Sequence, residues 1–248
     1  MKDRMFVVPG TFVPYNDTVT LLTYKRLRNL NLKIDVFALK TEFDKSLIDE
    51  LNNDIEYSKF NIKYSVDYSH AVPREHPFRL FSSFFYAKKY INDSLKEFEK
   101  NDYQYLYTSI APGLSHLAGL KIKKKYPNTY WYASFSDPFK GSPYKKAELE
   151  GRNIFYKFIY SVGGFVLYND KYEEAAILNA DKLIFICEEQ RDFTLKQYTN
   201  YKELKEKSII MPLTYIPKWK MYSNILTNPA IYDIIKSIRW NIVPTSST

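Results

Sequence analysis

Short apolar runs alternate with longer amphipathic stretches along the chain up to about residue 211. A run of four to eight apolar residues between turn residues is typical of a buried strand, whereas apolar residues three and four apart indicate a helix. The pattern predicts helices between the strands, including a long amphipathic helix over about 77–100. It predicts strands over 5–8, 34–39, part of 55–68, 103–107, 129–135, 182–187 and 208–211.

The first forty residues indicate the fold class. The apolar run 5–8 ends in the turn residues Pro9 and Gly10. N-cap candidates at 16–18 precede a segment with helical spacing, and a second strand follows over 34–39. Because a strand, a helix and a strand in this order form a crossover between parallel strands, we expect an α/β protein. Its sheet should be open, mostly parallel and Rossmann-like, with helices flanking it.

The pattern changes after Pro212. Residues 1–217 carry all the strand signals and are expected to form one Rossmann-like domain. Residues 218–248 contain a helix signal around 230–239 and a Ser/Thr-rich end. We expect them to be a linker or tail, since so short a segment cannot form a second domain of this kind.

Composition narrows the class of protein. Hydrophobic residues make up 45% of the chain, enough for a sizeable core, yet no apolar run reaches the length of about 18 residues that a membrane-spanning helix needs. The N-terminus lacks the apolar segment and cleavage site of a signal peptide. The single cysteine, Cys187, ends the apolar run 183–187 and is expected to be a buried strand residue rather than a nucleophile. These features favour the cytoplasm.

The net charge of +8 favours anionic partners such as nucleic acid, acidic lipid or phosphorylated ligands. Lysines at 121 and 123–125 close a predicted helix, where cations complement the helix dipole, so a solvated helix end explains them. No nucleic-acid recognition motif accompanies the charge, and nucleic acid is therefore not expected as a partner.

The common cofactor and metal motifs are absent. No G-x-G-x-x-G follows the first strand, and no G-x-x-x-x-G-K-[ST] occurs, so neither a dinucleotide site nor a P-loop is expected. The sequence has no G-x-S-x-G elbow and no H-E-x-x-H run. His70, His76 and His116 are scattered, and no metal site is expected.

Three segments, taken in order, resemble a known family. The first is 105–121, in which Ser109, Pro112 and His116 open a helix after a strand; the second is 130–139, which ends in Asp-Pro-Phe. The third is 179–190, a further strand that begins Ala-Asp and leads into a short helix. Together they resemble the N-terminal domain of GT-B glycosyltransferases of the broad family-four group. There a strand precedes an S-x-P-x-x-x-H helix opening, a strand ends in D-P-W, and an A-D-x-I-I-x-x-S strand precedes a short helix.

The resemblance covers most of residues 1–217. It implies transfer of a sugar from a nucleotide-sugar to a glycan or lipid-linked acceptor, as in polysaccharide biosynthesis, with no bound metal and no other cofactor. In this family the nucleotide-sugar is held mainly by a C-terminal donor-binding domain, and nothing in 218–248 resembles one. We therefore expect the chain to be half of an enzyme, inactive until a donor-binding domain or separate subunit is supplied.

Two departures from the family pattern concern the site. Gly10 stands alone where the family often has several glycines that approach the donor phosphates, and Tyr15, Asn16 and Asp17 occupy the following positions. The family's D-P-W tryptophan is Phe139. The first loop is therefore less suited to close contact with a pyrophosphate.

The candidate site follows from the fold. Ligands of an open α/β sheet bind beyond the carboxyl ends of its strands, here at the loops 9–17, 109–116 and 136–144. By resemblance, the last of these loops faces the acceptor, and Asp137 is the candidate catalytic residue, as a base or as a positioning group for an acceptor hydroxyl. The candidate substrate-binding residues are Gly10, Thr11, Asn16, Ser109, Ser115, His116 and Ser136.

Plainer roles exist for several of these residues. The serines can cap a helix, His116 can be an ordinary residue of a first helical turn, and Asp137 before Pro138 can form an Asx-turn. Two other classes of protein also stay open: a non-catalytic binding module, and a basic nucleic-acid-binding or nucleotide-handling α/β protein. A partner that supplies a donor-binding domain favours a split enzyme over the first class, and salt-dependent retention on nucleic acid favours the second.

Aromatic residues next to cations predict contact with an anionic membrane surface, at the inner face of the cell membrane. The alternative is that these aromatics belong to the core. The two groups are Phe78, Phe81, Phe84, Phe85 and Tyr86 beside Arg74, Arg79, Lys88 and Lys89, and Phe155, Phe158, Ile159 and Tyr160 beside Arg152 and Lys157.

Overall fold

The computed structural model describes residues 4–40, 43–67, 79–109, 114–136 and 170–212, together with residues 140, 150, 154 and 157–158. All of them belong to one compact unit, Met1–Leu213. The predictions for Pro112, for Asp137 and Phe139 and for residues 218–248 fall outside the described residues.

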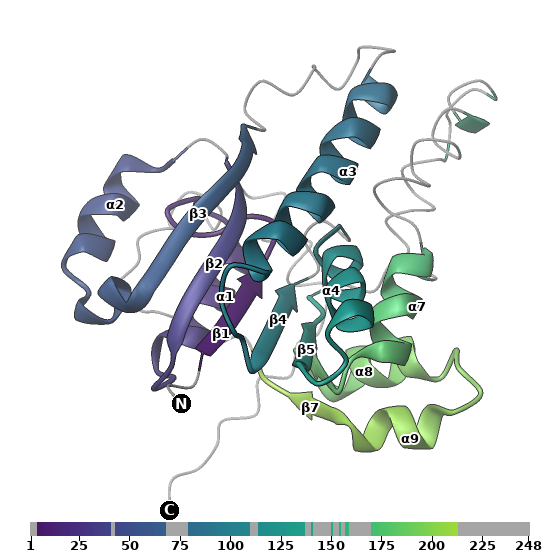
Figure 1. Ribbon diagram of the computed structural model, residues 1–248. Helices are drawn as coiled ribbons and strands as arrows, with labels where there is room; N and C mark the ends of the chain where they lie inside the picture. Colours follow the sequence, from purple (N-terminus) through teal and green to yellow (C-terminus); the bar gives the residue numbers. More distant parts are fainter. Residues whose placement is uncertain are drawn as a thin grey trace, which may run out of the picture. The chain divides into compact units, whose positions relative to one another are not determined.

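A single open sheet of seven strands, all parallel, organises the described chain (Figure 1). The strand order is β3-β2-β1-β4-β5-β6-β7, so the chain moves outward in one direction to β3 and then returns to β4 and moves outward the other way. The predicted open parallel sheet is confirmed. Its strands are β1 (Arg4–Val8), β2 (Lys33–Lys40), β3 (Phe60–Asp67), β4 (Tyr105–Ser109), β5 (Tyr130–Ser134), β6 (Lys182–Phe185) and β7 (Ser208–Ile210).

Local capping chemistry sets where several helices begin. Asp17 accepts from the backbone N–H groups of Val19 and Thr20, and Asp44 caps α2 in the same way, because an N-cap carboxylate satisfies N–H groups that have no partner inside the helix. The helices are α1 (Thr18–Arg28), α2 (Lys45–Asn52), the 3₁₀-helix η1 (Ile55–Lys59), α3 (Arg79–Phe98), α4 (Leu114–Lys125), α7 (Asp170–Asn179), α8 (Glu188–Leu195) and α9 (Tyr201–Glu206).

Cys187 corrects one expectation. β6 ends at Phe185, two residues earlier than predicted, and Cys187 is the half-buried N-cap of α8 instead of a buried strand residue. Its sulfur accepts from the backbone N–H of Gln190 at 3.5 Å. The strand stops because the Ile186 N–H turns to the side-chain oxygen of Gln190 instead of continuing the ladder. Burial raises the pKa of the Cys187 thiol, which disfavours the nucleophilic thiolate.

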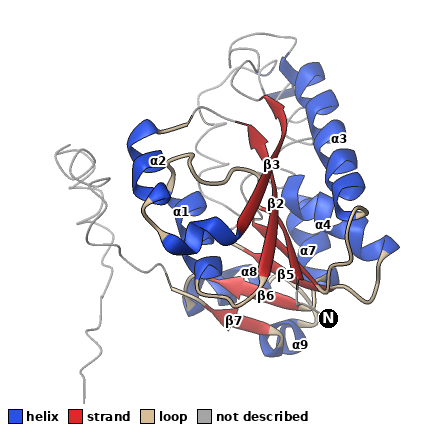
Figure 2. Cartoon of the chain, turned by 60° about the vertical axis from the view of Figure 1, so that its left-hand side comes forward, coloured by secondary structure: helices blue, strands red, loops and turns tan. Residues whose placement is uncertain are grey.

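Helices lie on both sides of the sheet (Figure 2), and we name its two faces after them. The α3 face packs against α3, α4 and α7 through one large core that includes Phe6, Leu106, Trp131 and Phe185. The α1 face carries the intervening residues of the same strands. Over β1 to β3 it is covered by a second aromatic cluster, in which the ring centroids of Phe12, Tyr24 and Phe60 lie 5.3–6.4 Å apart.

Handedness explains which helix lies on which face. A crossover between parallel strands is right-handed in nearly all proteins, so the direction in which the chain moves across the sheet decides the side of its helix. The crossover from β1 to β2 moves one way and places α1 on its face. The crossovers from β3 to β4 and from β4 to β5 move the opposite way, and their helices α3 and α4 lie on the other face.

Candidate functional site

The candidate site lies at the carboxyl ends of β1, β4 and β5, where the strand order reverses. Gly10 follows β1 with a φ of 82°, a backbone conformation that glycine adopts at little cost. Its N–H donates to the hydroxyl of Tyr90, 3.2 Å away on α3, and its carbonyl accepts from Leu39 at 2.6 Å. The Tyr90 hydroxyl in turn donates to the carbonyl of Phe37 at 3.2 Å. The first loop is thus tied to both β2 and α3.

Thr11 and Asn16 hold the first loop together. The Thr11 hydroxyl lies 3.0 Å from that of Thr20 and 3.4 Å from the N-cap carboxylate of Asp17. The exposed Asn16 donates to Asp44, the N-cap of α2, at 2.6 Å. These bonds connect the starts of two helices, so both side chains serve the shape of the loop. Their predicted contact with a substrate stays a prediction.

His116 is fully buried in the first turn of α4, next to the fully buried Ser115. Its Nδ1 lies 2.8 Å from the hydroxyl of Thr108, which also accepts from the indole N–H of Trp131 at 2.9 Å. The Thr108 hydroxyl can donate to Nδ1 or accept from it while accepting from the indole, so both neutral tautomers of His116 satisfy this contact. The Nε2 of His116 is buried and has no hydrogen-bond partner among the described residues.

Burial lowers the pKa of His116 to about 3, so the imidazole is neutral near pH 7. A neutral imidazole can donate one hydrogen bond, but it cannot serve as a cationic acid or as a counter-charge for phosphate. Its ring packs against Phe135 at 4.9 Å between centroids, and Phe135 begins the segment after β5. His116 therefore connects the first turn of α4 to the loop that carries Ser136.

Ser109 and Ser136 follow neighbouring strands at the same edge. Ser109 is the last residue of β4, is buried, and lies in register with Ser134 of β5. Ser136 is half-buried, and Asp137, the candidate catalytic residue, lies just beyond it outside the described residues. Gln190 holds the start of the loop after β5 in place, since its side-chain amide donates to the carbonyl of Phe135 at 3.3 Å.

The structure thus brings Gly10, Ser109, His116 and Ser136 to one edge of the sheet. Sequence reasoning missed Tyr90, which reaches this edge from α3, and Arg26, whose Nη1 donates to Ser134 at 2.8 Å from α1. A tyrosine in the middle of an apolar helix face and an arginine in the last turn of a helix carried no sign of these long-range contacts.

The described residues contain neither a metal-binding cluster nor a membrane-spanning helix. Within the part of the chain that the structure describes, no His, Cys, Asp and Glu side chains gather in the groups of three or more that could hold a metal ion. No described helix is long and apolar enough to cross a membrane. Of the aromatics predicted to meet a membrane surface, Phe85 and Phe158 are 68% and 66% exposed, whereas the side chains of Phe81, Phe84 and Phe155 lie outside the described residues.

Known proteins resemble this chain in three dimensions. No family model matches the sequence, and no curated protein matches it. The structure of Phytolacca americana UGT2 complexed with UDP-2fluoro-glucose and pterostilbene matches with a TM-score of 0.53 and 10% identity, covering 87% of this chain and 55% of that one. A UDP-glucosyltransferase from Polygonum tinctorium capable of glucosylating indoxyl, in complex with 3,4-dichloroaniline, matches with a TM-score of 0.51 and 10% identity, covering 87% and 54%.

These matches show the fold. The chain shares the Rossmann-like α/β architecture of GT-B UDP-glycosyltransferases, and it spans about half the length of the two solved structures.

Proposed function

We propose that this chain is the N-terminal, acceptor-side half of a glycosyltransferase, of the family-four type, that moves a sugar from a nucleotide-sugar to a glycan or lipid-linked acceptor. One observation carries the proposal: Gly10, Ser109, His116 and Ser136 lie at or after the carboxyl ends of β1, β4 and β5, where the strand order reverses in a fold shared with UDP-glycosyltransferases. Ligands of open α/β sheets bind at that place.

The reaction forms a bond between an acceptor oxygen and the anomeric carbon, breaks the bond from that carbon to the diphosphate, and releases the proton of the acceptor hydroxyl. Asp137 directly follows Ser136 at this edge. Two roles suit its carboxylate: a base that takes the proton, or an acceptor of a hydrogen bond that orients the hydroxyl. His116, neutral and enclosed, is a positioning residue that fixes the neighbouring segment through Phe135.

The donor side of the site is proposed to come from a donor-binding domain, in the same polypeptide or in a separate one. Support comes from the span of the match, which covers about half of each two-substrate neighbour. In such an enzyme the leaving diphosphate is neutralised by basic side chains and helix N-termini, with no metal required. Transfer needs both substrates held in one geometry, so the 248 residues alone are expected to turn over poorly.

The experiment compares the chain alone with the assembly it forms in its own cells. A tagged chain is purified with whatever accompanies it, nucleotide-sugars are added singly, and release of nucleoside diphosphate is measured together with the mass of the acceptor product. We expect release with one nucleotide-sugar in the assembly and no strong nucleotide-sugar binding to the chain alone by calorimetry. Micromolar binding of a nucleotide-sugar to the chain alone would contradict the proposal that another domain holds the donor.

Asp137→Asn tests the site in the same assembly, because it keeps the shape of the side chain and removes its charge. Turnover should fall by about 100-fold or more, with an unchanged melting temperature. Asp49→Asn is the matched control, since Asp49 is exposed on α2. Unchanged turnover in Asp137→Asn, or a loss that merely follows unfolding, would assign Asp137 to the turn and refute its role in the site.

A membrane surface is the second part of the proposal, since it would present a lipid-linked acceptor. Phe85 and Phe158 are exposed, and the neighbouring cations Lys88 and Lys157 are exposed as well. Apolar side chains beside cations bind anionic interfaces, and each nearby cation contributes about 1 kcal/mol. Flotation with acidic liposomes should recover more protein than flotation with neutral ones, and less at high salt. Equal recovery with both lipids would rule this surface out.

A further inference from the structure

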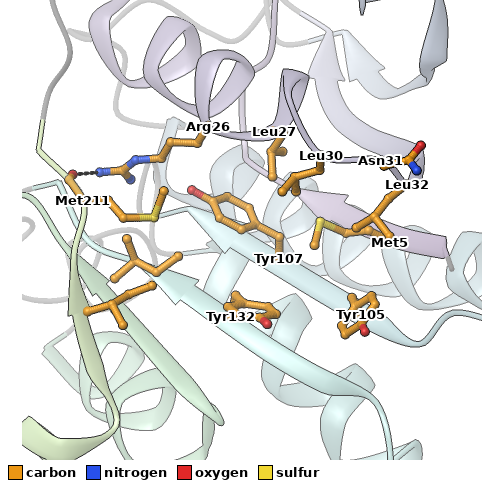
Figure 3. A pocket seen from close by; sticks show the side chains of 12 residues that line it. Met5, Arg26, Leu27, Leu30, Asn31, Leu32, Tyr105, Tyr107, Tyr132 and Met211 are labelled. Atoms are coloured by element: carbon orange, nitrogen blue, oxygen red, sulfur yellow. Dashed lines mark hydrogen bonds between the residues drawn. The ribbon is translucent and has the colours of Figure 1, made fainter.

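A pocket of about 420 Å³ lies on the α1 face of the sheet, away from the α3-face core (Figure 3). One wall comes from the end of α1 and the turn after it, through Arg26, Leu27 and Leu30. The floor comes from strand residues that include Tyr107 and Tyr132. The lining is mainly aliphatic and aromatic. A pocket of this size and character is typical of sites for small organic molecules.

Tyr107 places one polar atom in this apolar setting. The residue is only 3% exposed, and its hydroxyl is buried with no hydrogen-bond partner among the described residues. In Figure 3 its ring lies across the floor of the pocket with the hydroxyl on the side of Arg26. A buried hydroxyl without a partner is unfavourable, and buried polar groups in native proteins nearly always have one. An atom of a ligand in the pocket would supply it.

Arg26 adds a positive charge at the same end of the pocket. Its Nη1 donates to the hydroxyl of Ser134 at 2.8 Å and its Nη2 donates to the carbonyl of Met211, while its Nε is buried without a partner among the described residues. Both acceptors are neutral. No carboxylate within the described ranges forms an ion pair with Arg26. A cation beside apolar surface attracts an anion more strongly than one in water does.

We propose that this pocket binds a small planar aromatic anion. Its rings would lie against the side chains of Tyr107 and Tyr132 on the floor of the pocket, and its acid group would accept a hydrogen bond from the Tyr107 hydroxyl and face Arg26. Flat rings suit this floor because aromatic side chains favour offset or edge contacts with other rings. The volume accommodates a molecule of about two rings. The pocket lies on the α1 face, whereas His116 belongs to the α3 face, and Arg26 connects the pocket to Ser134 at the carboxyl edge.

The test uses the full chain and two matched probes: 2-naphthoate, which is a planar aromatic anion, and 2-naphthamide, its neutral counterpart. Titration calorimetry should show at least about tenfold tighter binding of the acid, the ratio that one hydrogen bond to a charged group gives. Saturation-transfer NMR should place the rings of both probes against protein aromatics. Equal affinity for acid and amide, or no binding of either, would overturn the proposal.

Variants then locate the acid group. Tyr107→Phe keeps the ring and removes only the hydroxyl, so naphthoate should bind about tenfold more weakly. Tyr130→Phe makes the same change at a half-buried tyrosine of β5 that is not among the residues lining the pocket, and should leave naphthoate affinity unchanged. Arg26→Met should abolish the preference for acid over amide.

The decision rests on Tyr107→Phe because this variant is expected to fold. It removes an unpaired buried hydroxyl and breaks no hydrogen bond to a described residue, so its melting temperature should equal or exceed that of the unaltered chain. Arg26→Met also removes the bonds to Ser134 and Met211, and it serves only as support. Naphthoate affinity that is unchanged in a well-folded Tyr107→Phe refutes the proposed site.

Discussion

The two faces of the sheet use the same strands in different ways. On the α3 face, Trp131 is fully buried and its indole N–H is paired through Thr108 with His116. On the α1 face, the neighbouring Tyr132 is half-buried and lines a pocket, and the hydroxyl of Tyr107 has no partner among the described residues. The α3 face buries its polar groups in a large continuous core, whereas the α1 face leaves Tyr132 partly exposed at a pocket.

Chain direction accounts for this difference. From β3 onward the chain crosses the sheet in one direction, and the handedness of crossovers places α3 and α4 on the same side. That side becomes a continuous core, as the packing of Leu106, Trp131 and Phe185 shows. Among the described residues, these crossovers place no helix on the opposite side of β4 to β7. We therefore expect the α3 face to contribute most of the stability and the α1 face to bind the ligand. Three predictions test this difference.

Adjacent residues on β5 should give the largest contrast. Trp131→Ala empties a fully buried site and removes a donor to Thr108, and should lower the free energy of unfolding by about 3–5 kcal/mol. Tyr132→Ala, one residue away on the other face, should lower it by only about 1 kcal/mol. Urea denaturation followed by circular dichroism measures both. Similar losses in the two variants would mean that the α1 face is as closely packed as the α3 face.

Gly119 tests how closely α4 approaches the sheet. A Cβ atom there would lie 2.6 Å from the Trp131 ring and 2.8 Å from Thr108. Gly119→Ala should therefore lower the free energy of unfolding by about 1–3 kcal/mol. Helix propensity alone would favour alanine by about 0.8–1.0 kcal/mol, so a net loss is diagnostic of overpacking. The exposed Lys124→Ala on the same helix is the control and should change stability little; a more stable Gly119→Ala would show that α4 has room to shift.

The buried His116 predicts that the free energy of unfolding depends on pH. Its folded pKa of about 3 lies below the ordinary value of 6.5, so the unfolded chain binds the extra proton first. Its contribution to stability is complete above pH 6.5 and is lost as the pH falls toward 3. The slope should approach about 1.4 kcal/mol per pH unit between these values.

The measurement compares urea unfolding of the unaltered chain and of His116→Gln at several pH values in this window. The variant has no imidazole at this position, so the difference in slope isolates the contribution of His116. Parallel pH profiles in the two proteins would indicate that the imidazole is protonated in the folded state, and hence that water or a ligand reaches Nε2.

The order of elements could be predicted because its signals are local. The apolar run at β1, the turn at Pro9-Gly10 and the carboxylate that caps α1 are each contained within a few residues. Periodicity then identifies strand and helix, and the strand-helix-strand order predicts the parallel sheet. The strand ends were less well defined: β4 ends at Ser109, two residues later than predicted.

The candidate site was predicted only as a region. Strand ends and polar residues placed Ser109 and Ser136 at one edge, since the carboxyl ends of parallel strands meet there. The sequence did not show that His116 turns inward, because its partners Thr108 and Trp131 come from two different strands. Nor did the sequence show that Cys187 caps a helix instead of ending a strand. The strand stops because the Ile186 N–H donates to the side chain of Gln190, and the sequence pattern gives no sign of that bond.

The sequence by itself determined the alternation of strands and helices, and through it the open parallel sheet and the edge where its loops meet. Only the tertiary structure decided which face each strand residue joins. In the run from Tyr130 to Ser134 every residue can be buried, and the alternation of side chains assigns Trp131 to the core and Tyr132 to the pocket only once the sheet and its helices are in place. Contacts such as that between Arg26 and Ser134 join residues 108 positions apart, and no local pattern encodes them.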